Sequence, residues 1–116
     1  MALYNLSAEQ GVLGAILIDA KSMLVANQLN LSVYDFFHPQ HQIIYNCMQK
    51  MYENGEKIDP VTISDELRNH DLLDKAGGVV YFKDLVTAVP SVSNVDYYAK
   101  IVKDFSMKRS GHEMLT

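Results

Sequence analysis

The sequence has a single cysteine, Cys47, and no tryptophan among its 116 residues. One cysteine cannot form a disulfide within the chain, and structural disulfides are rare in reducing compartments. The composition therefore favours a cytoplasmic protein that is held together by apolar packing. With 48% hydrophobic residues, the chain has enough apolar material for one domain with its own core.

Long hydrophobic runs are also missing. The longest apolar run, Gly11–Ile18, is far shorter than the roughly 20 residues that a membrane-spanning helix needs. The first basic residue, Lys21, follows that run, so the start of the chain lacks the charged front of a signal peptide. We expect no contact with a membrane.

Positive charge is scarce, because 10 Lys and Arg residues oppose 14 Asp and Glu residues and the formal net charge is −4. Domains that hold nucleic acid through its phosphates are typically basic. A helix-turn-helix reader would also need a basic recognition helix, and the segment 79–88 offers only Lys83. We therefore expect no direct sequence-specific binding of nucleic acid.

Motifs for catalysis are absent from the sequence. Nothing matches the phosphate-binding pattern G-x-x-x-x-G-K-[ST], so these residues are not expected to hydrolyse ATP. His38 and His41 precede Cys47 by two to three helical turns, but zinc needs about four converging ligands. We expect His38 to help cap a helix, His41 to lie on its surface and Cys47 to pack in the core. We therefore expect no catalytic site, no cofactor-binding site and no metal site in these residues.

Helix signals, by contrast, are frequent. Ser7 and Gln10 form a capping box at the start of the first helix, and the small residues Gly11 and Gly14 predict a close approach of another backbone to it. A short aromatic connector over 33–37 is expected to plug the core. Apolar periodicity predicts further helices over 20–29 (capped by Asp19), from Pro39 to Gly55, from Pro60 (capped by Asp59) to about 69, over 79–88 and from Asn94 to the end of the chain.

Four residues mark the turns between the later helices. Gly77 and Gly78 let the chain leave one helix and enter the next, because glycine tolerates a positive φ. Pro90 closes the fifth helix, and Asn94 (or Ser93) can cap the sixth. No segment alternates with a period of two. The predicted fold is all-α, a compact orthogonal bundle of about six short helices.

Five blocks of this sequence, in order, resemble the N-terminal domain of the bacterial replicative DNA helicase of the DnaB family. The first, over 8–17, is similar to the family pattern A-E-Q-x-V-L-G-x-x-L, and the second, over 36–45, to F-Y-x-x-x-H-x-x-I-F. The third, over 55–62, is similar to G-x-P-I-D-x-V-T, with Lys57 where proline is common. The others are Gly77-Gly78-x-x-Tyr81 and the segment from Pro90-Ser91 through Asn94 to Val102.

The resemblance implies a collar that assembles over a motor ring and binds the C-terminal domain of DnaG-type primase. It implies self-association as a dimer, a hexameric parent, and a helicase loader as a further candidate partner. ATP-driven 5′→3′ unwinding, with ATP and Mg²⁺, would belong to a RecA-like motor domain that these residues lack. Residues 1–92 would be the globular collar subdomain, and 93–116 the first arm of a dimerising helical hairpin.

The last helix carries the candidate interface. Its large apolar residues cannot all face one small core, so some of them are expected to contact a partner chain. The candidates are Tyr97, Tyr98, Ile101, Val102 and Phe105. A stripe that packs wholly within this domain is the alternative.

Two other functions remain open at this point. The chain is also compatible with the helicase-binding domain of primase, which has a related helical fold in those families. It is further compatible with a stand-alone phage or plasmid protein that captures primase or helicase. The segment from Gly77 to Asn94 favours the helicase collar over the primase domain.

Overall fold

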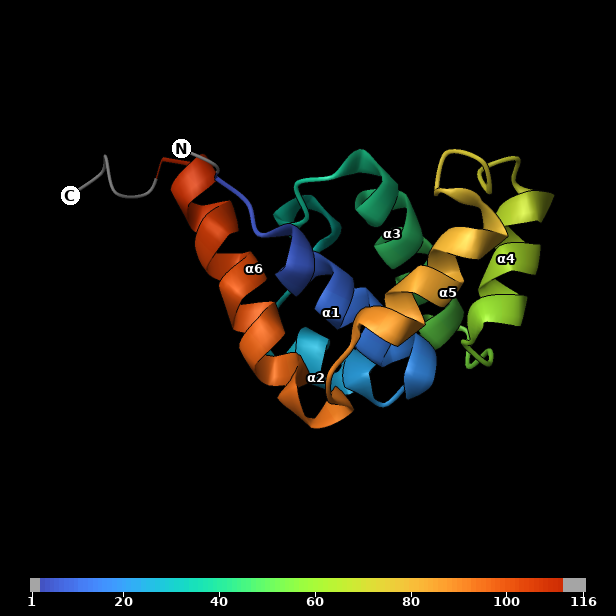
Figure 1. The fold of residues 1–116 in the computed structure, drawn as a ribbon, viewed down its shortest axis with the longest axis horizontal. Helices are drawn as coiled ribbons and strands as arrows, with labels where there is room; N and C mark the ends of the chain where they lie inside the picture. The colour runs from blue at the N-terminus through green and yellow to red at the C-terminus, as the bar shows by residue number, and fades with distance from the viewer. Residues whose placement is uncertain (1–2, 112–116) are drawn as a thin grey trace.

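The computed structural model describes residues 3–111 and places no β-strand among them, which confirms the expected all-α class. Six α-helices and two 3₁₀ helices follow one another in this part of the chain (Figure 1). They are α1 (Leu6–Ile18), α2 (Ser22–Gln28), η1 (Val33–Asp35), α3 (Pro39–Glu53), α4 (Pro60–Asn69), α5 (Gly78–Ala88), η2 (Val92–Asn94) and α6 (Val95–Arg109).

Helix α1 lies in the middle of the bundle. Figure 1 shows α6 along one side of it, with α5 and then α4 toward the opposite end of a molecule that measures 45 × 28 × 26 Å. Most of α1 is apolar on every side, and nine of its 13 residues are buried. A helix without a polar face is stable only when other helices surround it, so its composition matches its central place.

The start of α1 differs from the prediction. Asn5, not Ser7, caps the helix, because its Oδ1 accepts a hydrogen bond of 2.9 Å from the Ala8 N–H. The helix therefore begins at Leu6, and the predicted capping box is wrong. Gln10 is engaged elsewhere, since its side-chain amide donates to the hydroxyl of Tyr81. A capping side chain from outside the predicted box thus sets the first turn.

Helices α1 and α5 cross in close contact at Gly14. A Cβ atom built on Gly14 would lie 2.3 Å from the carbonyl oxygen of Leu85 and 2.3 Å from a methyl group of Val89. Only a residue without a side chain allows this approach, which confirms the predicted tight packing within the domain.

Helix α4 follows its predicted cap, and α3 and α4 both follow their predicted apolar stripes. Asp59 caps α4 by accepting from the N–H groups of Val61 and Thr62, and the Thr62 hydroxyl accepts from the Asp59 N–H in return. Proline stands at the first residue of both helices, where its missing N–H costs nothing. Of the expected core residues of α3 and α4, Ile43 is half-buried, and the others are buried: Ile44, Cys47, Met48, Met51, Ile63 and Leu67.

The predicted turns are present. Gly77 and Gly78 have φ values of +109° and +80°, and α5 begins at Gly78. α5 ends at Ala88, two residues before Pro90. Asn94 occupies the residue before α6, but its side chain makes no capping hydrogen bond. The turn assignment is confirmed, and the role of Asn94 as a capping side chain is not.

Two helices are shorter than predicted. Helix α2 begins at Ser22, because Asp19 holds the Lys21 N–H in a turn ahead of the helix. Helix α6 ends at Arg109 rather than at the end of the chain, and Gly111 follows with φ +77°. The part of this predicted helix over 112–116 lies outside the described residues. Within the described part, no helix combines the length and apolar character needed to cross a bilayer.

Candidate functional site

An aromatic and aliphatic stripe runs along the outer side of α6. Tyr97, Ile101 and Phe105 are four residues apart, so they lie one above another on the helix surface. Tyr97 is 62% exposed, and Ile101 and Phe105 are half-buried. The opposite side of α6 supplies Val95, Ala99 and Val102 to the core. Ile101, like Tyr98, also packs partly against the core of this domain. The helix therefore has a buried inner side and a flank of large side chains that this chain covers only in part.

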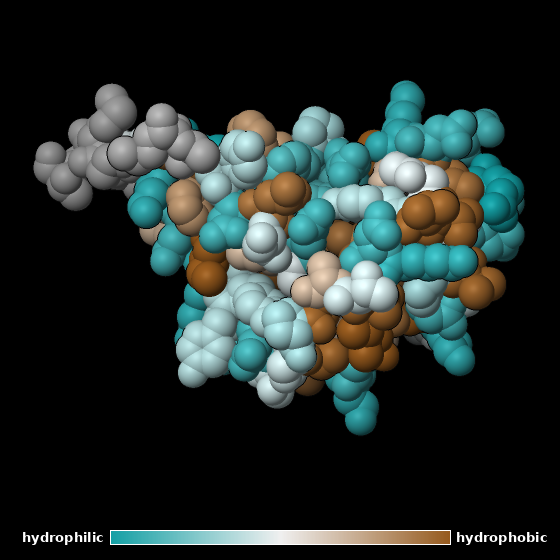
Figure 2. Space-filling model, viewed as in Figure 1, coloured by the Kyte–Doolittle hydropathy of each residue, from teal (hydrophilic) through white to brown (hydrophobic). Residues whose placement is uncertain are grey.

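Two lysines cover the rings of this stripe. Lys100 lies 5.8 Å from the ring centroid of Tyr97, and Lys108 lies 4.9 Å from that of Phe105. Such cation–π contacts place a charged group over an aromatic ring. Each contributes about 0.5–1 kcal/mol of attraction at an exposed site. On the face seen in Figure 2, α6 accordingly shows a mixed surface, while apolar residues gather over the carboxyl end of α1 and over α5.

A groove of about 350 Å³ adjoins the stripe, between α1, α6 and the chain that follows α5. Tyr98 and Ile101 form its α6 side, and Pro90 lies on the opposite side. Small residues of α1, among them Ala8 and Gly11, form its floor, and their short side chains leave room for the hollow. We call Tyr97, Tyr98, Ile101 and Phe105 the α6 face.

Val102 does not belong to the α6 face. Its side chain is 2% exposed and packs in the main core with Ala99. The interface prediction for Val102 is therefore wrong, because the helix turns this residue to the same side as the core residues Val95 and Ala99. The other four candidates remain accessible, fully or in part.

A carboxylate in the connector holds α6 against the rest of the domain. Asp35 accepts hydrogen bonds from the Ser32 N–H, the Ser106 hydroxyl (2.7 Å) and the Lys103 ammonium (3.1 Å). Arg109 donates to the carbonyl oxygens of Leu3 and Asp35, so the first and last described segments meet here. These bonds hold the carboxyl-terminal end of α6, and with it the α6 face, against the rest of the domain.

The pKa of Asp35 reflects these contacts. Burial by itself would raise the pKa, but the bonds from the Ser32 N–H, the Ser106 hydroxyl and the positively charged Lys103 together lower it below the ordinary value of 3.8. Asp35 is thus a charged carboxylate at neutral pH, and the charge is part of the attachment of α6.

A second buried carboxylate, that of Glu9, is contacted by Phe37, His38 and His41. Its Oε2 accepts from the Phe37 N–H at 2.8 Å. Its Oε1 lies 2.7 Å from Nδ1 of His41 and 3.0 Å from Nδ1 of His38. The other ring nitrogen of His41, Nε2, lies 2.5 Å from the hydroxyl of Tyr81 on α5. We call Glu9, His38, His41 and Tyr81 the Glu9 cluster.

Two predictions about these histidines are wrong. His41 was expected on the surface of its helix and is completely buried, with its ring parallel to that of Tyr81. His38 stands at the residue before α3, but its side chain makes no capping bond and lies against Glu9 instead. A buried glutamate lets both imidazoles find a hydrogen-bonding partner inside the domain.

Sequence reasoning missed Glu9 although a signal was present. Glu9 lies four residues before Leu13 and seven before Ile16, on the inward side of an otherwise apolar helix. A charged residue at such a place requires buried partners. Burial would raise its pKa, but the hydrogen bonds from His41, from the Phe37 N–H and from His38 lower it below the ordinary value of 4.5.

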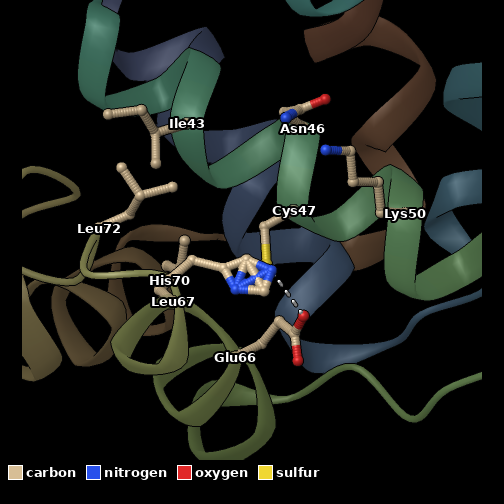
Figure 3. A pocket seen from close by; sticks show the side chains of 8 residues that line it. All are labelled: Ile43, Asn46, Cys47, Lys50, Glu66, Leu67, His70 and Leu72. Carbon is tan, nitrogen blue, oxygen red and sulfur yellow. Dashed lines mark ion pairs between the residues drawn. The ribbon is translucent and has the colours of Figure 1, made fainter.

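Cys47 packs as predicted, in a small cavity of about 50 Å³ between α3 and α4 (Figure 3). Glu66 of α4 and His70, the residue that follows this helix, pair across 3.6 Å at this site. Burial first, and then the nearby carboxylates of Glu66 and Glu56, raise the pKa of the Cys47 thiol to about 11. The thiol is therefore protonated at neutral pH, which makes it a poor nucleophile and a poor metal ligand.

Taken together, these features define an all-helical domain with large side chains exposed or half-buried along one side of α6. Residues 1–104 match the model of the DnaB-like helicase N-terminal domain. The chain therefore belongs to this family, as the five sequence blocks predicted. It is 43% identical over 105 residues to the replicative DNA helicase DnaC of Bacillus subtilis, and 39% identical over 107 residues to the replicative DNA helicase DnaB of Treponema pallidum.

These matches cover 90% and 92% of this chain but only 23% and 24% of the relatives. The chain thus spans about a quarter of the length of the curated helicases it matches. Among solved structures, the N-terminal domain of DnaB helicase from Mycobacterium tuberculosis superimposes with a TM-score of 0.92 at 34% identity, covering 97% of this chain and 81% of that one.

A second solved structure is that of a DnaB-like replicative helicase, described together with its interactions with primase. It superimposes with a TM-score of 0.80 at 27% identity, and the match covers 96% of this chain and 26% of that one.

Proposed function

We propose that this domain is the N-terminal collar of a replicative DNA helicase, and that it works by assembling with copies of itself and by binding primase. The observation that carries the proposal is the α6 face, a stripe of large side chains on the outer side of a helix whose inner side is already buried. The relatives, which are replicative helicases, support the same setting.

In this proposal the segment 93–116 is the first arm of a helical hairpin, and residues 1–92 are the globular collar subdomain. The α6 face would pack against the same face of a second copy. A two-fold contact places each stripe against its equivalent, so that one set of apolar residues serves both partners. The adjoining groove would receive side chains from the partner at Tyr98 and Ile101.

The proposed protein partner is the C-terminal domain of DnaG-type primase. The support is the solved helicase of the same fold that was described with its interactions with primase. A helicase loader is a further proposed partner. ATP-dependent 5′→3′ unwinding, with ATP and Mg²⁺, would reside in a motor domain of the parent hexamer, because the chain spans about a quarter of its relatives. Bacterial replication takes place in the cytoplasm, which is the proposed location.

The test of self-assembly is a light-scattering mass measured across a dilution series. Replacing Phe105 by Asp places a charge in the α6 face and is expected to shift the chain toward monomer with an unchanged helical circular-dichroism spectrum. The matched control is Val80→Asp, since Val80 is 69% exposed on α5 and lies outside the α6 face. Equal masses for both variants and the unsubstituted chain would contradict the proposed interface.

Partner choice is tested by titrating the chain against the purified primase C-terminal domain and, separately, against the helicase. Binding to primase alone supports the collar or a stand-alone protein that captures primase. Binding to the helicase alone would support the alternative, in which the chain is a helicase-binding domain of primase or a stand-alone protein that captures helicase.

A further inference from the structure

The Glu9 cluster brings three metal-ligating atoms to one point. One carboxylate oxygen of Glu9 and one ring nitrogen each of His38 and His41 all lie within 4.8 Å of one another. The three residues come from α1, from the residue before α3 and from α3 itself. Cys47 follows these histidines in the sequence, but its sulfur lies in the separate cavity between α3 and α4. The fold supplies Glu9 in its place.

We infer that Glu9, His38 and His41 form a binding site for a divalent transition-metal ion of the zinc type. Two imidazole nitrogens and one carboxylate oxygen are ligands that Zn²⁺ prefers. Three protein ligands leave a fourth position for water. Glu9 is 1% exposed and His41 is fully buried, so two of the ligands are already desolvated and held in place.

The surroundings of the three ligands match those of metal sites. Metal-bound imidazoles usually hydrogen-bond through their second nitrogen, which orients the ring. Here Nε2 of His41 faces the hydroxyl of Tyr81, and the second oxygen of Glu9 accepts from the Phe37 N–H. The outer partners that would orient two of the ligands therefore come from α5 and the connector.

The distances allow an ion with a small adjustment. Ligand atoms about 2.0–2.2 Å from a tetrahedral Zn²⁺ lie roughly 3.3 Å from each other. Nδ1 of His41 and Nδ1 of His38 lie 2.7 and 3.0 Å from Oε1 of Glu9, so these two distances need to lengthen by only a few tenths of an ångström. All three ligand atoms lie within 4.8 Å of one another, and a turn of the His38 ring would set the remaining distance between the two imidazoles. The side chain of His38 is 24% exposed, which provides both the freedom to move and an entry path.

Binding would also change the direction of the hydrogen bond behind His41. A neutral His41 with its proton on Nδ1 would donate to the Glu9 carboxylate, which faces that nitrogen, and would leave Nε2 to accept from the Tyr81 hydroxyl. An ion at Nδ1 requires that nitrogen to be unprotonated, so the proton resides on Nε2 and donates to the Tyr81 oxygen. The tautomer of His41 is thus a direct report of occupancy, and ¹⁵N chemical shifts of the ring distinguish the two forms.

The first experiment is calorimetric titration of the metal-free chain with Zn²⁺, together with the melting temperature with and without the ion. We expect one ion per chain and a higher melting temperature when it is bound, because the ion binds only the folded cluster. His38→Ala should abolish both effects. Tyr81→Phe removes only the outer partner and should weaken binding by about 10–100-fold.

The matched control is His70→Ala, which removes an exposed histidine just after α4 and should leave Zn²⁺ binding unchanged. Absence of binding to the unsubstituted chain, or equal affinity in His38→Ala, would overturn the inference. Absorption of the Co²⁺-loaded chain needs no variant: tetrahedral bands without sulfur-to-metal charge transfer are expected, and a thiolate band would assign the ion to Cys47 instead.

Discussion

Gly14 shows how one missing side chain fixes the place of a whole helix. The carbonyl of Leu85 and a methyl group of Val89 occupy the space where a Cβ atom of residue 14 would be. The backbone carbonyl cannot move away alone, because α5 is held at both ends by the turns at Gly78 and Pro90. Close packing in protein interiors leaves little room to absorb such a contact.

We predict that Gly14→Ala destabilises the domain by about 1–3 kcal/mol through overpacking, in spite of the higher helix propensity of alanine. Gly55→Ala is the control. It has φ +71° and no atom within 4 Å of its Cβ, so it meets only the backbone strain of about 1–2 kcal/mol. Urea unfolding of both variants measures the difference. A Gly14→Ala domain as stable as the parent would refute the close crossing of α1 and α5.

At the scale of the elements, α6 is the helix whose placement depends on charge. Its amino-terminal half is attached through the core residues Val95 and Ala99, whereas its carboxyl-terminal half is attached through the bonds of Lys103, Ser106 and Arg109 to the connector. Because Asp35 accepts two of these bonds on a buried carboxylate, the loss of its charge should loosen the same half that carries Phe105.

We predict that Asp35→Asn lowers the free energy of unfolding by about 1.5–3 kcal/mol at neutral pH, the usual range for hydrogen bonds to charged groups. The folded-state pKa of Asp35 is lowered, so its contribution is complete above the unfolded value near 3.8 and is lost as the pH falls through the folded value. The gap between variant and parent should therefore narrow in acid.

Urea midpoints measured from neutral pH down to about pH 3 test this dependence. Asp104→Asn, which removes an exposed carboxylate from the same helix, is the control and should stay close to the parent throughout. A gap between Asp35→Asn and the parent that stays constant with pH would show that the charge of Asp35 does not hold α6.

At the scale of the whole molecule, the acidic balance limits what the domain can contact. The segment 53–74, which includes α4, has seven acidic residues against Lys57 and Arg68. The basic residues of α6 are engaged with aromatic rings and with Asp35 in several places. Phosphate backbones bind proteins by displacing counterions onto clustered lysines and arginines, and the chain as a whole is deficient in these.

We therefore predict no saturable binding of the isolated domain to single-stranded or duplex DNA at physiological salt. Fluorescence anisotropy of labelled oligonucleotides is the measurement, and the proposed full-length helicase is the positive control. Saturable binding that weakens steeply with added salt would contradict the prediction, since such a slope reports phosphate contacts.

The sequence by itself determined the helices and most of the turns between them. Apolar spacing, the Asp59 cap and the glycine pair at 77–78 are local signals that act within a few residues, so they could be interpreted without the fold. The same holds for the family, whose motifs are blocks of adjacent residues, and for the burial of Cys47 on an apolar stripe. The α6 face was partly predicted, and its assembly role stays a prediction.

Only the tertiary structure decided which polar groups lie inside. His41 is buried because Glu9, 32 residues earlier, and Tyr81, 40 residues later, occupy the two sides of its ring. Val102 is a core residue because α6 turns that side toward the rest of the bundle. The physical reason is the separation along the chain over which each effect acts. Helix propensity and capping depend on neighbouring residues in the sequence, whereas burial depends on segments that meet only after folding.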